Sequence, residues 1–109
     1  MITLLVVGPR DRAAELDAAA ARSPSIELLH AAELEEALDR LARNRRIDAV
    51  LLLLESDTAR AVAQTVLEED PSAPPMFAPA SGGEIAGVRV LPGRTGEELL
   101  GSIVRELSS

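Results

Sequence analysis

The amino-acid sequence predicts one α/β domain built around a parallel β-sheet. The strongest indication is the stretch from Ile47 to Glu55, in which seven of nine residues are apolar and do not alternate with polar ones. A short continuous apolar run is typical of a strand that is covered on both faces. Strand-like and amphipathic stretches alternate along the chain, which is typical of parallel strands joined by right-handed helical crossovers. A length of 109 residues fits a single domain spanning 1–109.

The first half of the chain predicts two strands and two helices. We expect strands at 2–7 and 25–30 and helices at 9–22 and 33–45. The second strand alternates apolar and polar residues, which favours an edge position in the sheet. The second helix has acidic residues at its start and arginines at its end, and both suit the helix dipole. The apolar positions expected to face the core are Ala13, Leu16 and Ala20 in the first helix and Leu34, Ala37, Leu38, Leu41 and Ala42 in the second.

The second half begins with the central strand and predicts two further strands and two further helices. Asp57 is expected to cap a helix that ends at Asp70-Pro71. A short strand follows at 76–80, with Pro79 marking its end. The glycine-rich stretch 81–87 is too short for more than about one helical turn. A fifth strand at 88–91 then leads to a last helix.

Thr95 and Glu98 are spaced as a capping box at the start of this last helix. Five strands alternating with helices, one of them shortened, predict a flavodoxin-like sheet with strand order 2-1-3-4-5.

Composition excludes several kinds of chemistry. The chain has no cysteine, which removes disulfides, thiol nucleophiles and thiolate metal sites. All eleven basic residues are arginine, so no lysine amine is available. The formal net charge of −7 argues against nucleic acid as the main partner. The apolar N-terminus is too short for a signal peptide or a membrane span, so we expect a cytoplasmic protein without a membrane partner.

The stretch 27–38, followed by Ile47-Asp48-Ala49-Val50-Leu51-Leu52, resembles the receiver domain of bacterial response regulators. Receivers commonly have a similar second strand, a Glu-Glu-Ala-Leu helix start and an Asp-x-Val-Leu-Leu third strand. The resemblance covers nearly the whole chain and rests on this pattern. It implies a two-component signalling module with a five-stranded parallel sheet.

The residues on which receiver chemistry depends can be compared one by one. Receivers carry an acidic pair after the first strand that holds Mg²⁺, and Gly8 and Pro9 occupy those positions here. The phosphoacceptor aspartate of receivers corresponds to Leu53, which has no nucleophile. The hydroxyl residue that ends the fourth strand in receivers is matched by Ala80 or Ser81, of which only Ser81 has a hydroxyl. The lysine after the fifth strand has no counterpart in Leu91-Pro92-Gly93-Arg94. The resemblance therefore implies a degenerate receiver, or pseudo-receiver, with no metal and no cofactor.

Other polar residues have alternative interpretations. Glu55 lies two residues beyond Leu53 and either imitates a phosphorylated aspartate or is a solvated loop acid. His30 is either a phosphorelay or pH-sensing residue or a structural histidine without a matched acid. The arginines 40, 43, 45 and 46 either bind an anionic partner or simply complement a helix C-terminus.

We expect a non-catalytic domain that is not an enzyme and that acts through contact with a protein partner or a second copy. The resemblance places the contact face around Ile85, Arg89, Arg94 and Glu98. One alternative is a regulatory domain that binds a small molecule or an anion with the loops at 81–83 and 92–94. Two others are an enzyme or enzyme subunit and a domain excised from a longer regulator.

Overall fold

The computed structural model describes residues 2–22, 25–43, 46–54, 56–69, 73–79, 87–91 and 95–108. These residues form five strands and four helices in alternating order, except that β4 leads to β5 without a described helix between them. The elements are β1 (Ile2–Val7), α1 (Arg10–Ala21), β2 (Ile26–Ala31), α2 (Leu34–Arg43), β3 (Ala49–Leu52), α3 (Ser56–Glu69), β4 (Met76–Pro79), β5 (Val88–Leu91) and α4 (Gly96–Ser108).

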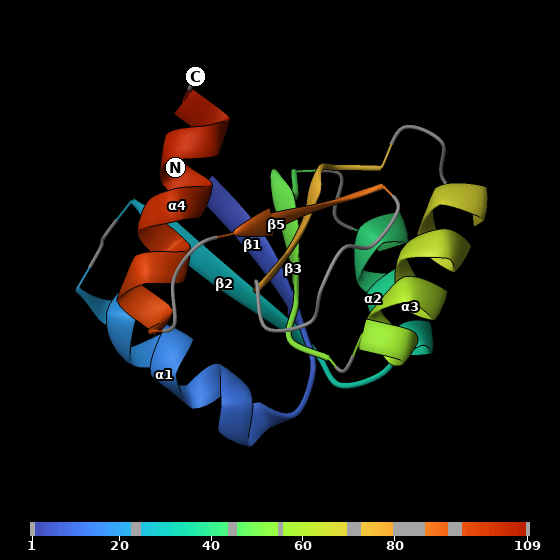
Figure 1. The fold of residues 1–109 in the computed structure, drawn as a ribbon, viewed down its shortest axis with the longest axis horizontal. Helices are drawn as coiled ribbons and strands as arrows, with labels where there is room; N and C mark the ends of the chain where they lie inside the picture. The colour runs from blue at the N-terminus through green and yellow to red at the C-terminus, as the bar shows by residue number, and fades with distance from the viewer. Residues whose placement is uncertain are drawn as a thin grey trace.

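All neighbouring strands are parallel, and the strand order is β2-β1-β3-β4-β5 (Figure 1). The predicted topology is therefore confirmed, including the edge position of β2. At the centre of the sheet, Val7 pairs with Ala31 on one side and with Leu52 on the other. This register brings the carboxyl ends of β1, β2 and β3 to the same level, so the residues that follow these strands are close in space.

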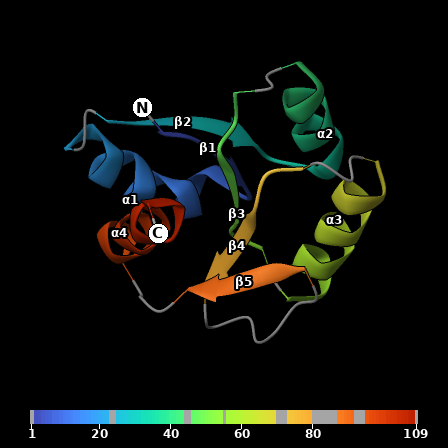
Figure 2. The same ribbon diagram turned by 90° about the horizontal axis from the view of Figure 1, so that it is seen from above.

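The core lies on both faces of the sheet. Helices α2 and α3 cover one face, and α1 and α4 cover the other (Figure 2). Each face has its own cluster of buried side chains, and alternate residues of β1 and β3 supply them. Because β3 is buried on both faces, its residues Ala49 to Leu52 show no alternation of polar and apolar types.

The exact faces and ends of several elements differ from the prediction. In α1 the buried positions are Ala13, Leu16 and Ala19, whereas Ala20 is only partly buried. Four alanines in succession, at positions 18–21, gave no pattern from which Ala19 could be distinguished. In α2, Ala42 was expected to face the core and is exposed. Asp57 is not the cap of α3, because that helix begins at Ser56 and Asp57 lies in its first turn. An acid there still complements the helix dipole.

The connection between β4 and β5 is short, as expected. Pro79 is the last residue of β4, and β5 begins at Val88. Parallel strands are usually joined by a dozen or more residues, which this connection lacks. The expected single turn of helix falls at 81–87, and all but Gly87 of that stretch lies outside the described residues.

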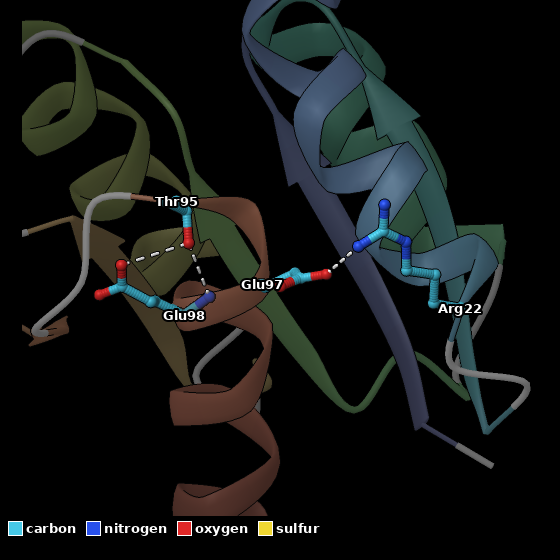
Figure 3. Close-up of polar contacts among 4 residues, drawn as sticks. All are labelled: Arg22, Thr95, Glu97 and Glu98. Carbon is cyan, nitrogen blue, oxygen red and sulfur yellow. Dashed lines mark hydrogen bonds and ion pairs between the residues drawn. The ribbon is translucent and has the colours of Figure 1, made fainter.

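Helix α4 begins with the predicted cap. The backbone N–H of Glu98 donates to the Thr95 Oγ1 atom at 3.2 Å, and the Thr95 hydroxyl lies 3.3 Å from the Glu98 Oε1 atom (Figure 3). The Glu98 carboxylate therefore contacts the side chain of Thr95. The bond from the Glu98 N–H to the Thr95 hydroxyl, which is the first of the two bonds of a capping box, is confirmed, and it fixes the point at which the chain leaves β5 for α4.

Candidate functional site

The carboxyl ends of β1 and β3 meet at the edge of the sheet where the resemblance to receivers places a phosphorylation pocket. The backbone N–H of Leu53 donates to the Val7 carbonyl at 2.8 Å, and that of Gly8 donates to the Ala31 carbonyl at 2.9 Å. These bonds extend the sheet one residue beyond the strand ends. Gly8 and Leu53 are therefore brought side by side.

Gly8 touches the backbone of Leu53. Its φ is +151°, and a Cβ atom at this position would lie 2.5 Å from the Leu53 carbonyl oxygen and 3.0 Å from the Leu53 Cβ. Real Cβ atoms do not come this close to a backbone oxygen. Any side chain at position 8, a carboxylate included, would therefore require the backbone of residue 8 or of Leu53 to shift.

Leu53, the residue that the resemblance matches to the phosphoacceptor, is buried. Its side chain is 4% exposed and belongs to the apolar cluster under α1 and α4, which includes Leu51 and Phe77. An aliphatic side chain has no atom that attacks phosphorus. Here it contributes packing and keeps water from the strand ends.

Pro9 supplies a helix start in place of a metal ligand. It is the N-cap residue of α1, it has an extended backbone, and it makes no side-chain cap bond. We expected it at the first turn of the helix, and the structure places it one position earlier. Its carbonyl accepts from the Ala13 N–H at 3.2 Å, so the residue serves the backbone of the helix.

The described residues that match the receiver pocket do not fit Mg²⁺. The ion takes several oxygen ligands, usually with one or two carboxylates, whereas Gly8, Pro9 and Leu53 offer none from their side chains. Glu36, a carboxylate from the start of α2, accepts from the Ala32 N–H at 2.9 Å and so caps the end of β2. Across the described part of the chain, no group of three or more His, Asp or Glu side chains could hold a metal ion.

Two pocket residues and two residues of the contact face lie outside the described residues. These are Glu55 and Ser81 in the pocket, and Ile85 and Arg94 on the face. The imitation of a phosphorylated aspartate by Glu55 stays a prediction. The same holds for anion binding by the loops at 81–83 and 92–94.

The described residues of the contact face are already paired within the chain. Arg89 of β5 forms an ion pair with Glu106 of α4, with 2.6 Å between Nη1 and Oε2. Glu98 binds the hydroxyl of Thr95. Both ion-pair partners keep substantial exposure, so the Arg89–Glu106 pair lies at the surface where β5 and α4 adjoin.

One contact corrects the interpretation of His30. The His30 Nε2 atom lies 2.8 Å from the Asp17 Oδ1 atom, so the histidine does have an acidic partner. Asp17 comes from α1 and His30 from β2, and nothing in the local sequence connects them. The pair ties α1 to the adjacent strand, which supports the structural interpretation. Arg43, likewise, pairs with Asp39 on the same helix at 3.0 Å.

The fold is that of response regulator receiver domains. A chain in the crystal structure of the phosphorylated P1 domain of CheA3 in complex with CheY6 from R. sphaeroides has a TM-score of 0.63 and 22% identity, covering 99% of this chain and 98% of that one. A two-component response regulator from Clostridium difficile has a TM-score of 0.67 and 16% identity, covering 99% and 96%. The receiver domain of the hybrid histidine kinase CckA has a TM-score of 0.64 and 23% identity, covering 98% and 99%.

These likenesses extend along the whole length of the chain and establish its architecture. No protein-family model and no curated protein matches the sequence. Within the described residues, no helix is long and apolar enough to cross a membrane.

Proposed function

We propose that this chain is a pseudo-receiver, a non-catalytic signalling domain that keeps the receiver scaffold and acts through contact with another protein. The observation that carries the proposal is the pairing of Gly8 with Leu53. A buried leucine stands where the resemblance places the phosphoacceptor, and the backbone beside it leaves no room for a side chain at position 8.

The absence of lysine supports the same proposal. A cation after the fifth strand offsets the charge of a phosphoryl group in receivers, and this chain has no lysine anywhere. The nucleophile, the metal ligands and the lysine of receivers are thus all replaced in this chain. A scaffold that binds partners needs none of them, because its surface and its fold are enough.

A scaffold without this chemistry can still act by binding another protein. The solved complex of the CheA3 P1 domain with CheY6 concerns a protein of this fold bound to another protein. For this chain we place the contact on the surface where β5 meets α4, around Arg89 and Glu98. We further propose that the domain belongs to a bacterial two-component pathway and works in the cytoplasm without enzymatic activity.

Phosphoryl transfer gives the direct test. The purified chain is mixed with Mg²⁺ and acetyl phosphate, or with the phosphorylated P1 domain of CheA3, and is followed by intact-mass spectrometry. A receiver with a complete acidic pocket serves as the positive control. We expect no phosphoryl adduct on this chain, and an adduct mapped to an aspartate would refute the proposal.

The contact face needs its own experiment. Arg89→Glu removes the ion pair with Glu106 and reverses the charge at the β5–α4 surface, whereas Arg40→Glu makes the same change on α2. The product of the gene adjacent to this one serves as the probe in a binding titration. We expect Arg89→Glu to weaken binding and Arg40→Glu to leave it unchanged. Weaker binding by Arg40→Glu, with no effect of Arg89→Glu, would contradict a contact at the β5–α4 surface.

A further inference from the structure

Gly101 has no structural reason to be glycine within the single chain. It lies in the middle of α4, it is exposed, and a Cβ atom added there would meet no heavy atom within 4 Å. Glycine inside a helix costs about 0.5–1 kcal/mol relative to alanine. Gly96 differs, because a Cβ atom there would lie 2.8 Å from the Glu15 carbonyl oxygen of α1. Packing within the chain therefore explains Gly96 and leaves Gly101 unexplained.

A groove lies beside Gly101. It has a volume of about 390 Å³ and runs between the end of α1, the start of β2 and the outer side of α4. An ion pair between Arg22 of α1 and Glu97 of α4 stands at its rim (Figure 3). The remaining lining residues are small or apolar, namely Ala19, Ser25, Ile26, Leu100, Gly101 and Val104.

The charges on this side of α4 are symmetric about Gly101. Glu97 lies four residues before Gly101 and Arg105 four residues after it, and both side chains are exposed. Residues four apart share one face of a helix. The acid and the base therefore lie on the same face as Gly101, each displaced from it by about 6 Å along the helix axis, in opposite directions.

We propose that this chain forms a two-fold dimer in which α4 packs antiparallel against α4 of a second copy, with the two helices crossing at Gly101. A two-fold axis through this crossing point places Glu97 of each copy, which also forms the ion pair with Arg22 of its own chain, opposite the partner's Arg105. Gly101 then has a use, because a residue without a side chain lets two helix backbones approach closely.

The charge symmetry selects a second copy as the occupant. A helix of another protein would need a base and an acid at the matching spacing, and an antiparallel copy of α4 has both at that spacing. The contact is separate from the proposed partner face around Arg89, and neither depends on the other. A single helix crossing buries less surface area than a stable interface, which buries about 1,200–2,000 Å². Both copies are also acidic and repel each other, so the dimer is weak.

Sedimentation of the purified chain over a wide concentration range tests the dimer. We expect reversible dimerisation of the wild type and at least about tenfold weaker association of Gly101→Leu. The leucine has open space in the single chain and favours helix, so the melting temperature of the monomer stays equal or rises. A loss of association without a loss of stability separates contact between copies from a folding defect.

Exchanging the charges of Glu97 and Arg105 tests how the two α4 helices are aligned. Glu97→Arg and Arg105→Glu should each weaken association, because each puts like charges opposite one another. The double variant carries both changes in one chain, restores opposite charges across the two-fold axis and should recover association. Arg40→Glu on α2 is the control and should have no effect.

Single cysteines locate the axis, since the natural chain has none. Gly101→Cys should form a disulfide-linked dimer on mild oxidation, whereas Ala42→Cys on α2 and Val90→Cys on β5 should not. The proposal is overturned by a wild-type chain that stays monomeric at every concentration. It is also overturned by a dimer that is unchanged in Gly101→Leu or that cross-links through Val90→Cys and not through Gly101→Cys.

Discussion

Gly8 and Leu53 adjoin at the ends of β1 and β3, and each restricts the residue type that the other position accepts. The carbonyl oxygen of Leu53 occupies the space that a Cβ atom of residue 8 would need. The leucine side chain is in turn buried among apolar neighbours, which do not solvate a charge. We therefore expect that no single substitution at Gly8 or Leu53 creates a phosphorylation pocket here.

Leu53→Asp should lower the free energy of unfolding by more than about 3 kcal/mol, because it places an unpaired carboxylate in the core. Leu53→Met keeps volume and polarity and should cost less than about 1.5 kcal/mol. Urea unfolding measures both variants. An aspartate variant as stable as the methionine variant would mean that the site is more open to water than the structure indicates.

Gly8→Ala should cost about 1–3 kcal/mol, since alanine must either adopt an unfavourable positive φ or push Leu53 away. Gly101→Ala is the matched control within the same chain, because its Cβ atom meets open space. It should stabilise the protein by about 0.5–1 kcal/mol. Opposite signs for the two glycines in thermal or urea unfolding are the expected result, and equal signs would contradict this account.

Among the elements, α4 has an outer side that is exposed and an inner side that is buried. Leu99, Leu100 and Ile103 are buried against the sheet, and the cap at Thr95 fixes where the helix begins. Gly96 lets its first turn rest on the backbone of α1. These contacts position the helix, which leaves Glu97, Gly101 and Arg105 facing outward.

Thr95→Ala should destabilise the protein by about 1 kcal/mol, because it leaves the Glu98 N–H without its side-chain acceptor. Thr95→Ser keeps the hydroxyl and is the control. A thermal melt that shows the serine variant close to the wild type and the alanine variant below it would match the prediction. Two equally destabilised variants would show instead that the methyl group of Thr95 carries the effect.

Most elements could be predicted from the sequence because their signals are local. The apolar run of β3 and the Thr95–Glu98 spacing needed no tertiary information. The buried position in a run of alanines, the pairing of His30 with Asp17 and the contact of Gly8 with Leu53 were not predictable in this way. Each depends on which segments the sheet brings together.

At the scale of the whole molecule, the strand order followed from the alternation of elements, and the likeness to solved receivers agrees with it. The pocket could be predicted only as a set of replaced residues, because the sequence does not show that Gly8 and Leu53 touch. The groove beside Gly101 was not predicted at all. It is formed by α1, β2 and α4, which lie far apart along the chain.

The measurement that tests the central claim most directly is an NMR titration of the ¹⁵N-labelled chain with Mg²⁺ and beryllofluoride, which imitates a phosphoryl group on a receiver. A pocket occupied by Leu53 and closed by Gly8 predicts no saturable shifts of the amides around these two residues. Saturable, Mg²⁺-dependent shifts at Gly8 and Leu53 would contradict the claim that this scaffold has lost the phosphoryl switch.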